Sequence, residues 1–300
     1  MLIDKAKGCL IGLACGDAVG TTVEFKPRGS FELMTDMVGG GPYDLEKGQW
    51  TDDTSMALCL GYSLLETKGF NAEDQMNRYV NWSNFGYMSS NGKCFDIGNT
   101  VSEALDNYIK SKDPYSGPTG KYDSGNGCIM RLAPVPIFYH NNYENAIKYA
   151  GLSSRTTHGS EFCIDSTKLM CNIILNALHL DDKDDILENI KYNPITQEVL
   201  DLKHGEFYTK SYEEITGSGY VIESLETALW CFFKSNSFKE AILLAVNVGH
   251  DADTTAAICG QIAGAFYGYE GIPESWKESI TMKDDIIDLA TDLYNFNILS

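Results

Sequence analysis

Residues 250–268 read His-Asp-Ala-Asp-Thr-Thr-Ala-Ala-Ile-Cys-Gly-Gln-Ile-Ala-Gly-Ala-Phe-Tyr-Gly, an acidic start followed by small and apolar residues. The run has the composition of a buried helix, although Gly260 and Gly264 each cost about 1 kcal/mol of helix stability relative to Ala. Such a helix makes sense if a neighbouring backbone lies very close to it. The N-terminal segment, with Gly8 and Gly12, has the same character. We therefore expect these two helices to pack against each other.

A second acidic cluster opens another helix-patterned segment far earlier in the chain. Residues 50–54 read Trp-Thr-Asp-Asp-Thr, and residues 250–254 read His-Asp-Ala-Asp-Thr. One cluster alone is typical of helix capping, because backbone N–H groups at a helix start favour anions. Capping needs only one acceptor, however, and the surplus carboxylates repel one another. If the two helix starts converge, oxygen ligands of this kind suit Mg²⁺, Mn²⁺ or Ca²⁺ better than Zn²⁺. The sequence therefore predicts a metal centre with two divalent ions.

Helical periodicity dominates the rest of the chain. Apolar residues recur at helical spacing, and segments of this kind are residues 10–14, 56–64, 164–180, 221–233 and 238–248. The last of these follows a capping-box sequence, Ser-Phe-Lys-Glu, at residues 237–240. Residues 135–139 have a β-type composition, but the prolines there disfavour a central strand. We predict an all-α, many-helix fold. No linker composition divides the chain, so we expect a single domain over residues 1–300.

Composition excludes several classes of partner. The chain has 23 basic and 42 acidic residues, a net charge of −19, which argues against nucleic acid and anionic membranes as partners. No segment reaches the roughly 20 apolar residues that cross a bilayer. The nine cysteines form no C-x-x-C motif and several lie in apolar patterns, as expected of buried thiols in a reducing compartment. The N-terminal apolar run is short and interrupted by glycine, so we interpret it as a core helix of a cytoplasmic protein.

Glycine-rich loops and isolated polar residues are further candidates for a ligand site. The loops at residues 123–127 and 216–219 leave backbone amides free to contact phosphates or sugars. Glu24 is a candidate fifth carboxylate, whereas Asp17 is expected to be a structural hydrogen-bond acceptor near a helix end. His158 either orients a substrate or satisfies a hydrogen bond in the core.

The adjacent pair His250-Asp251 supports a different hypothesis, since such pairs occur in metal-dependent all-helical phosphohydrolases. Those enzymes need further histidine ligands. The remaining histidines have no recognisable metal-ligand spacing, and this reading leaves the first acidic cluster unexplained.

Short motifs follow one another in a distinctive order from Ile3 to about Trp276. They are Gly16–Gly20, Glu24-Phe25, Gly48–Met56, Asp96–Thr100, Gly125–Arg131, Thr157-His158, Gly219-Tyr220 and Gly249–Thr255. This order resembles the ADP-ribosylglycohydrolase family, and the two acidic clusters are its most specific part. The resemblance implies an all-α fold with a binuclear Mg²⁺ or Mn²⁺ centre at helix N-termini.

The resemblance also implies roles for individual residues. The metal ligands would be Thr51, Asp52, Asp53, Asp251, Asp253 and Thr254. Glu24 would lie beside the metals near the scissile bond, and Glu24, Asp52 or Asp253 would take the proton of the attacking water. ADP-ribose would contact the glycine-rich loops and His158, through Ser124, Asn126, Gly127, His158, Gly217, Ser218, Gly219 and Tyr220.

The implied reaction is hydrolysis of the bond at C1 of the distal ribose in an ADP-ribose conjugate, through an oxocarbenium-like transition state. A mono-ADP-ribosylated protein modified on arginine is the first expectation. ADP-ribosyl-serine, O-acetyl-ADP-ribose or another conjugate are alternatives, as is a non-catalytic member of the family. Two departures from the family pattern, His250 and Gly159-Ser160, bear on the identity of the leaving group more than on the chemistry.

Overall fold

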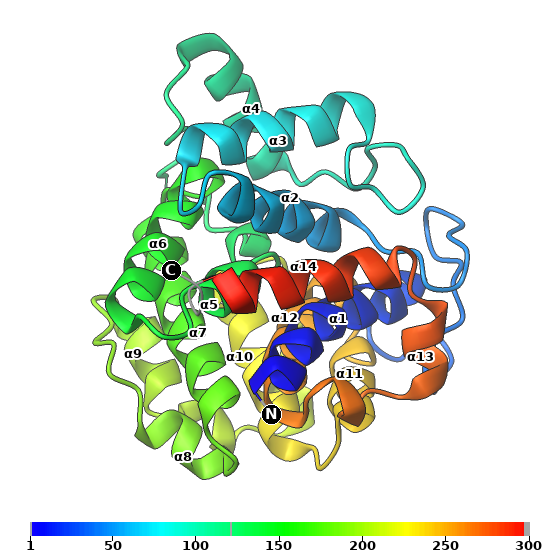
Figure 1. The fold of residues 1–300 in the computed structure, drawn as a ribbon. Coiled ribbons are helices and arrows are strands. Elements are labelled where there is room, and N and C mark those ends of the chain that lie inside the picture. Colours follow the sequence, from blue (N-terminus) through cyan, green and yellow to red (C-terminus); the bar gives the residue numbers. More distant parts are fainter. Residues whose placement is uncertain (1, 121, 297–300) are drawn as a thin grey trace.

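The computed structural model describes residues 2–120 and 122–296, and this part of the chain is helical with no extended strand (Figure 1). The first helices are α1 (Leu2–Gly20), α2 (Asp52–Glu66), α3 (Ala72–Phe85), α4 (Asn99–Ser111), α5 (Pro134–Phe138), α6 (Tyr143–Thr157) and α7 (Glu161–His179). They are followed by α8 (Lys183–Glu188), α9 (Gln197–Lys203), α10 (Val221–Lys234), α11 (Phe238–Val246), α12 (Ala252–Tyr267), α13 (Glu274–Ser279) and α14 (Lys283–Phe296). The all-α prediction is confirmed.

The central feature is the close antiparallel pair of α1 and α12, as the glycines predict. A Cβ atom added to Gly12 would lie 2.3 Å from the carbonyl oxygen of Gly260, and one added to Gly8 would lie 2.3 Å from that of Gly264. At the far end of α1, a Cβ on Gly20 would lie 2.4 Å from the Cα atom of Asp253. Because the helices run in opposite directions, the C-terminal end of α1 lies beside the N-terminal end of α12.

The remaining predicted helices are present with small shifts of their ends. The expected helix at residues 164–180 is α7, and those at 221–233 and 238–248 are α10 and α11. The capping box before α11 is only half formed: Ser237 accepts a hydrogen bond from the amide of Glu240, but the Glu240 carboxylate accepts from the amide of Asn236 instead. The proline-containing segment is the short helix α5, with Pro134 in its first turn.

Helix α2 separates the large core from a smaller one. Met56 and Cys59 of α2 pack in the smaller core with α3 and α4, whereas Leu60 and Leu64 pack in the large core. Figure 1 shows α3 and α4 stacked over α2 at one end of the molecule. No helix among the described residues is long and apolar enough to cross a membrane.

Candidate metal centre and ligand cavity

The start of α2 is fixed by a carboxylate from α1. Asp17, which is fully buried, accepts hydrogen bonds from the backbone amides of Thr51 (2.9 Å) and Thr54 (3.1 Å). It also accepts from the two threonine hydroxyls, at 2.9 and 2.6 Å. Asp17 is therefore the structural acceptor that the sequence predicts, and its side chain, which comes from α1, caps the N-terminus of α2. Since α1 packs along α12, this cap also places the start of α2 beside the start of α12.

The two acidic clusters meet at this point. The Thr254 hydroxyl at the start of α12 lies 3.2 Å from Oδ1 of Asp53 at the start of α2, and the Thr51 hydroxyl lies 3.5 Å from Oδ2 of Asp253. Carboxylate oxygens of Asp17, Asp53 and Asp253 lie within 4.8 Å of one another. The predicted convergence of residues separated by two hundred positions in sequence is confirmed.

A second group of three carboxylates adjoins the first and shares one member with it. Oxygens of Glu24, Asp96 and Asp253 also lie within 4.8 Å of one another. Glu24 follows the short 3₁₀ helix after α1, and Asp96 comes from the segment that leads into α4. Asp96 has a left-handed backbone (φ 53°) and accepts a 2.6 Å hydrogen bond from the Tyr43 hydroxyl. Asp253 therefore belongs to both sets of three carboxylates.

Burial and mutual repulsion make this cluster electrostatically costly without a cation. Burial, reinforced by neighbouring carboxylates, raises the pKa values of Asp52, Asp53 and Asp253 well above the usual range. The same causes raise the pKa of Glu24 to about 9. Among the described residues, one carboxylate oxygen each of Glu24, Asp53 and Asp253 is buried with no hydrogen-bond partner. Divalent cations relieve such repulsion, so this oxygen-rich donor set fits a hard metal ion.

Asp251 is held by the loop between α4 and α5. The Asn126 side-chain amide donates hydrogen bonds to Oδ2 of Asp251 (2.6 Å) and to the Ser224 hydroxyl (2.7 Å), so both of its hydrogens are engaged. The backbone amide of Asp251 donates to the carbonyl of Gly217 (2.9 Å), and that of Asn126 donates to the carbonyl of Gly219 (3.1 Å). Asn126 therefore positions an acidic residue of the cluster.

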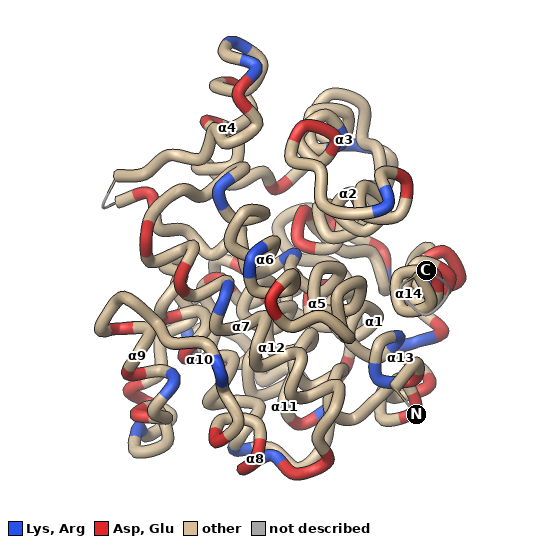
Figure 2. The backbone as a smooth tube through the Cα atoms, turned by 60° about the vertical axis from the view of Figure 1, so that its left-hand side comes forward, with Lys and Arg blue, Asp and Glu red and all other residues tan. Residues whose placement is uncertain are grey.

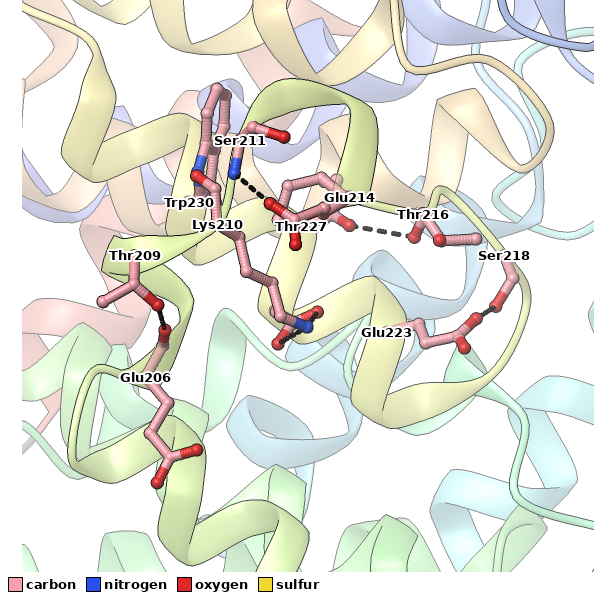
Figure 3. Close-up of polar contacts among 12 residues, drawn as sticks. Glu206, Thr209, Lys210, Ser211, Glu214, Thr216, Ser218, Glu223, Thr227 and Trp230 are labelled. Atoms are coloured by element: carbon pink, nitrogen blue, oxygen red, sulfur yellow. Dashed lines mark hydrogen bonds and ion pairs between the residues drawn. The ribbon is translucent and has the colours of Figure 1, made fainter.

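The loop at residues 216–219 is tied to α10 (Figure 3). The Thr227 hydroxyl donates to the carbonyl of Thr216 (2.9 Å), and the Ser218 hydroxyl donates to the Glu223 carboxylate. The same loop pairs with the loop before α5, since the backbones of Gly125 and Tyr220 form an isolated β-bridge. The two glycine-rich loops therefore form one wall.

A cavity of about 900 Å³ opens above the carboxylates, within the size range of small-molecule sites. Its lining includes the first turn of α4, which has no side-chain cap, and the predicted site residues Glu24, Asp52, Asn126, Gly127, His158, Gly217, Ser218, Gly219, Asp251 and Thr254. Thr51, Asp53 and Asp253 are buried next to the lining. Ser124 and Tyr220 instead join the two loops, because the amide of Val221 donates to the Ser124 carbonyl (2.9 Å).

His158 presents a neutral ring to this cavity. Arg131 can only donate, and it lies 2.6 Å from the Thr157 hydroxyl, which leaves the hydrogen of that hydroxyl available to Nδ1 of His158 (2.8 Å). This arrangement favours the tautomer with the ring proton on Nε2. Burial and the nearby Arg131 lower the pKa of His158 to about 3. Gly127 leaves room for the ring, because a Cβ there would lie 2.7 Å from Cε1.

Phe25 and His250 form a strained pair at the cavity rim. Both residues are left-handed, with φ values of 62° and 60°. The Phe25 amide donates to the His250 carbonyl (2.7 Å), and the His250 amide donates to the Lys26 carbonyl (2.8 Å). Both residues line the cavity, and Phe25 is 64% exposed. An exposed aromatic ring on a strained backbone is a marker of a ligand-contacting position.

Comparison with known proteins agrees with this geometry. The sequence model of the ADP-ribosylglycohydrolase family matches residues 1–298. The chain belongs to the ADP-ribosylglycohydrolase family. It is 42% identical over 292 residues to the ADP-ribosylarginine hydrolase Tri1 of Serratia proteamaculans (strain 568), covering 97% of this chain and 79% of that one. It is 29% identical over 286 residues to the ADP-ribosyl-[dinitrogen reductase] glycohydrolase of Rhodospirillum rubrum, covering 93% and 91% of the two chains.

A solved structure of an ADP-ribosylglycohydrolase-related protein complex superposes with a TM-score of 0.87 at 36% identity, covering 98% of each chain. This enzyme is thus an all-α ADP-ribosylglycohydrolase with buried acidic groups able to hold metal. Among residues 2–120 and 122–296, the sets of side chains that could hold a metal ion consist of Asp and Glu and include no histidine. The histidine-based phosphohydrolase hypothesis is therefore not supported. His140 and His179 instead lie near each other, and His140 stacks on Tyr294.

Sequence reasoning missed Asp96 as a member of the cluster in this ADP-ribosylglycohydrolase. The motif Asp-Ile-Gly-Asn-Thr at residues 96–100 was part of the family resemblance, but its acid was given no role. A single Asp in a loop has no periodic partner, so nothing in its local sequence distinguishes it from a surface residue. Its position just before an uncapped helix start was the available signal.

Proposed function

We propose that this ADP-ribosylglycohydrolase removes mono-ADP-ribose from modified arginine side chains of proteins, by hydrolysing the glycosidic bond at C1 of the distal ribose. The observation that carries the proposal is the shared Asp253, which joins two groups of three carboxylates under a 900 Å³ cavity. The similarity to two ADP-ribosylarginine hydrolases, at 42% and 41% identity, supports arginine as the linkage.

We propose two divalent cations, Mg²⁺ or Mn²⁺, as cofactors. Two adjoining carboxylate groups support a site for more than one ion, and the unpartnered buried oxygens of Glu24, Asp53 and Asp253 support occupancy by cations. The proposed ligands are Thr51, Asp52, Asp53, Asp251, Asp253 and Thr254. Bound cations would supply positive charge that orients the ribose hydroxyls and makes water more acidic.

The protein groups around the cluster then account for the other requirements of the reaction. Glu24 lines the cavity and has one unpartnered carboxylate oxygen, so it is our first choice for the group that takes the proton of the attacking water. Asp52 and Asp253 remain the alternatives. Asn126 keeps Asp251 in one orientation.

The two glycine-rich loops and the start of α4 are proposed to hold the diphosphate and the adenosine. Backbone amides of a helix start favour phosphate oxygens, and α4 begins at the cavity without a side-chain cap. His158 offers Nε2–H as a neutral donor from the cavity wall, which suits a sugar hydroxyl or a phosphate oxygen.

The test is release of free ADP-ribose from an ADP-ribosyl-arginine protein and from an ADP-ribosyl-serine peptide, with Mg²⁺, with Mn²⁺ and with a chelator. We expect metal-dependent release from the arginine substrate, lost in Asp253→Asn. Asp106→Asn, an exposed acid on α4, is the matched control and should keep full activity. Release from the serine peptide alone would overturn the linkage, and metal-independent release would overturn the mechanism.

A further inference from the structure

A groove of about 620 Å³ lies between α6, α7 and residues 191–193, with a lining that shares no residue with the first cavity. Its lining contains four basic side chains, Lys148, Arg155, Lys168 and Lys191, and a single acid, Glu144. Figure 2 shows several basic positions close together around α6. Four basic side chains in one groove are unexpected in a chain with 42 acidic and 23 basic residues.

Within the part of the chain that the structure describes, the four cations form no ion pair. Basic side chains elsewhere pair with carboxylates, as Lys210 does with Glu226 at 2.7 Å. Among the described residues, no carboxylate oxygen lies within 4.0 Å of the four cations in the groove. They lie over aromatic rings instead, Lys191 over Tyr143 (5.5 Å) and Lys168 over Tyr192 (5.7 Å). Their combined positive charge is therefore available to an anion in the groove.

The groove is preformed, because buried polar groups fix its walls. Oδ1 of Asn172 accepts hydrogen bonds from the Tyr143 hydroxyl (3.1 Å) and from the backbone amides of Lys191 (2.9 Å) and Tyr192 (3.0 Å). The Tyr192 hydroxyl donates to Asp165 at 2.6 Å. A site that is rigid before binding loses less entropy when a ligand enters.

The spacing of the cations sets the length of the ligand. Lys148 and Arg155 are seven residues apart on α6, so they lie on one face about 10 Å apart along the helix axis. Lys168 on α7 faces them across Gly151, where a Cβ would lie 2.5 Å from Cε of Lys168. Two phosphate groups at this separation could each contact a cation at one end of the row, without either long side chain bending toward the other.

We propose that the groove binds a small molecule with two phosphoryl groups about 10 Å apart. Lysine and arginine are the usual donors to phosphate oxygens, and a groove of this volume suits a small molecule. The net charge of −19 would repel a long polyanion such as a nucleic acid. The site is independent of the proposed hydrolase reaction.

The test is isothermal titration of the protein, in Mg²⁺, with a hexose 1,6-bisphosphate and with the corresponding 6-monophosphate. We expect the bisphosphate to bind at least tenfold more tightly, and its affinity to fall as salt is raised, because exposed charges are screened. The double variant Lys148→Glu/Lys191→Glu should weaken bisphosphate binding at least tenfold. Both lysines are exposed, so the variant is expected to fold.

The matched control is Lys110→Glu/Lys234→Glu, which makes the same change of charge at exposed positions on α4 and α10. It should bind the bisphosphate as the wild type does. Asp253→Asn should also bind normally, which separates this groove from the carboxylate cavity. No binding of the bisphosphate, equal binding of the monophosphate, or equal loss in the two charge variants would each overturn the proposal. Urea unfolding checks that every variant is folded.

Discussion

Oδ2 of Asp17 lies 2.6 Å from the Thr54 hydroxyl and 3.1 Å from the Thr54 amide, and this contact fixes the start of α2 against the end of α1. The contact joins two helices that are separated in sequence by a long connection without regular strands. Because α1 also lies against α12, Asp17 indirectly sets the distance between the two acidic clusters. A residue outside the proposed ligand set therefore helps to set the geometry of the carboxylate cluster.

Replacing Asp17 with Asn should damage both stability and metal binding. The Asn side chain can accept at only one of its two positions, so donors from Thr51 or Thr54 would lose their acceptor in a buried site. Each buried unsatisfied group costs about 1–3 kcal/mol. We expect the free energy of unfolding to fall by that order and Mg²⁺ affinity to fall at least tenfold, measured by urea unfolding and by calorimetry. Unchanged values, with Asp106→Asn as the control, would show that Asp17 does not set the cluster.

Stability should depend on pH more steeply without metal than with it. Burial raises the pKa of Glu24 to about 9, and those of Asp52 and Asp53 well above their usual value of 3.8. A group whose pKa is raised in the folded state stabilises the fold below its unfolded pKa, and this contribution is lost as pH rises through the folded pKa. In a chelator, the free energy of unfolding should therefore fall steadily from about pH 4 to pH 9.

Saturating Mg²⁺ should remove most of this fall, because bound cations stabilise the charged carboxylates that protons otherwise neutralise. Urea unfolding at pH 5 and pH 8, with Mg²⁺ and with chelator, measures the effect. Equal pH slopes in the two conditions would contradict the assignment of the cluster as a cation site.

The glycine contacts between α1 and α12 give a prediction about packing alone. In Gly12→Ala the new Cβ would lie 2.3 Å from the Gly260 carbonyl oxygen, so the helices must separate. Overpacking of this kind costs about 1–3 kcal/mol, and more where backbone must move. Gly98→Ala is the matched control, since φ is −65° there and nothing lies within 4 Å of the new Cβ. Gly98 is the N-cap residue of α4, where Ala is less favourable than Gly, so the control should lose at most about 1 kcal/mol in thermal unfolding. Equal loss in both variants would contradict the packing argument.

Features with a local or periodic signature were predictable from the sequence. Apolar spacing predicted α7, α10 and α11, and glycines within a helical pattern predicted the close pair of α1 and α12. The convergence of the two acidic clusters was also predictable, because helix capping does not explain the surplus carboxylates at the two helix starts. The single-domain organisation and the role of each ligand stay predictions.

Features that depend on tertiary contacts were not predictable. The Asn126 side chain contacts Asp251 only because the loop of residues 123–127 lies against the loop of residues 216–219. Asp96 reaches the cluster through a left-handed turn held by Tyr43. The strained pair of Phe25 and His250 likewise requires two segments that meet only in the folded protein. The spacing of residues in the sequence does not indicate these contacts.

Asn126 should act on the metal centre through Asp251. In Asn126→Ala, Asp251 loses the 2.6 Å hydrogen bond that helps to orient its carboxylate. Groups that orient metal ligands typically contribute 10–100-fold in metal affinity or activity. We expect Mg²⁺ affinity to fall within that range, with activity partly rescued by higher Mg²⁺. If KM for the substrate rises while metal affinity is unchanged, Asn126 contacts the substrate instead of positioning Asp251.

Phe25 should show a conflict between stability and activity. A left-handed backbone costs a residue with a Cβ about 1–2 kcal/mol, which glycine avoids. Phe25→Gly should therefore be more stable than Phe25→Ala by about 1 kcal/mol in urea unfolding. Both variants remove the exposed ring at the cavity rim, next to Glu24 and the strained His250, where the leaving group is expected to pass. Both should lower kcat/KM for ADP-ribosyl-arginine at least tenfold, since an aromatic face attracts a guanidinium group. Phe25→Tyr keeps the ring and should keep the activity; full activity in Phe25→Ala would show that the strain at this position serves the backbone pair with His250 alone.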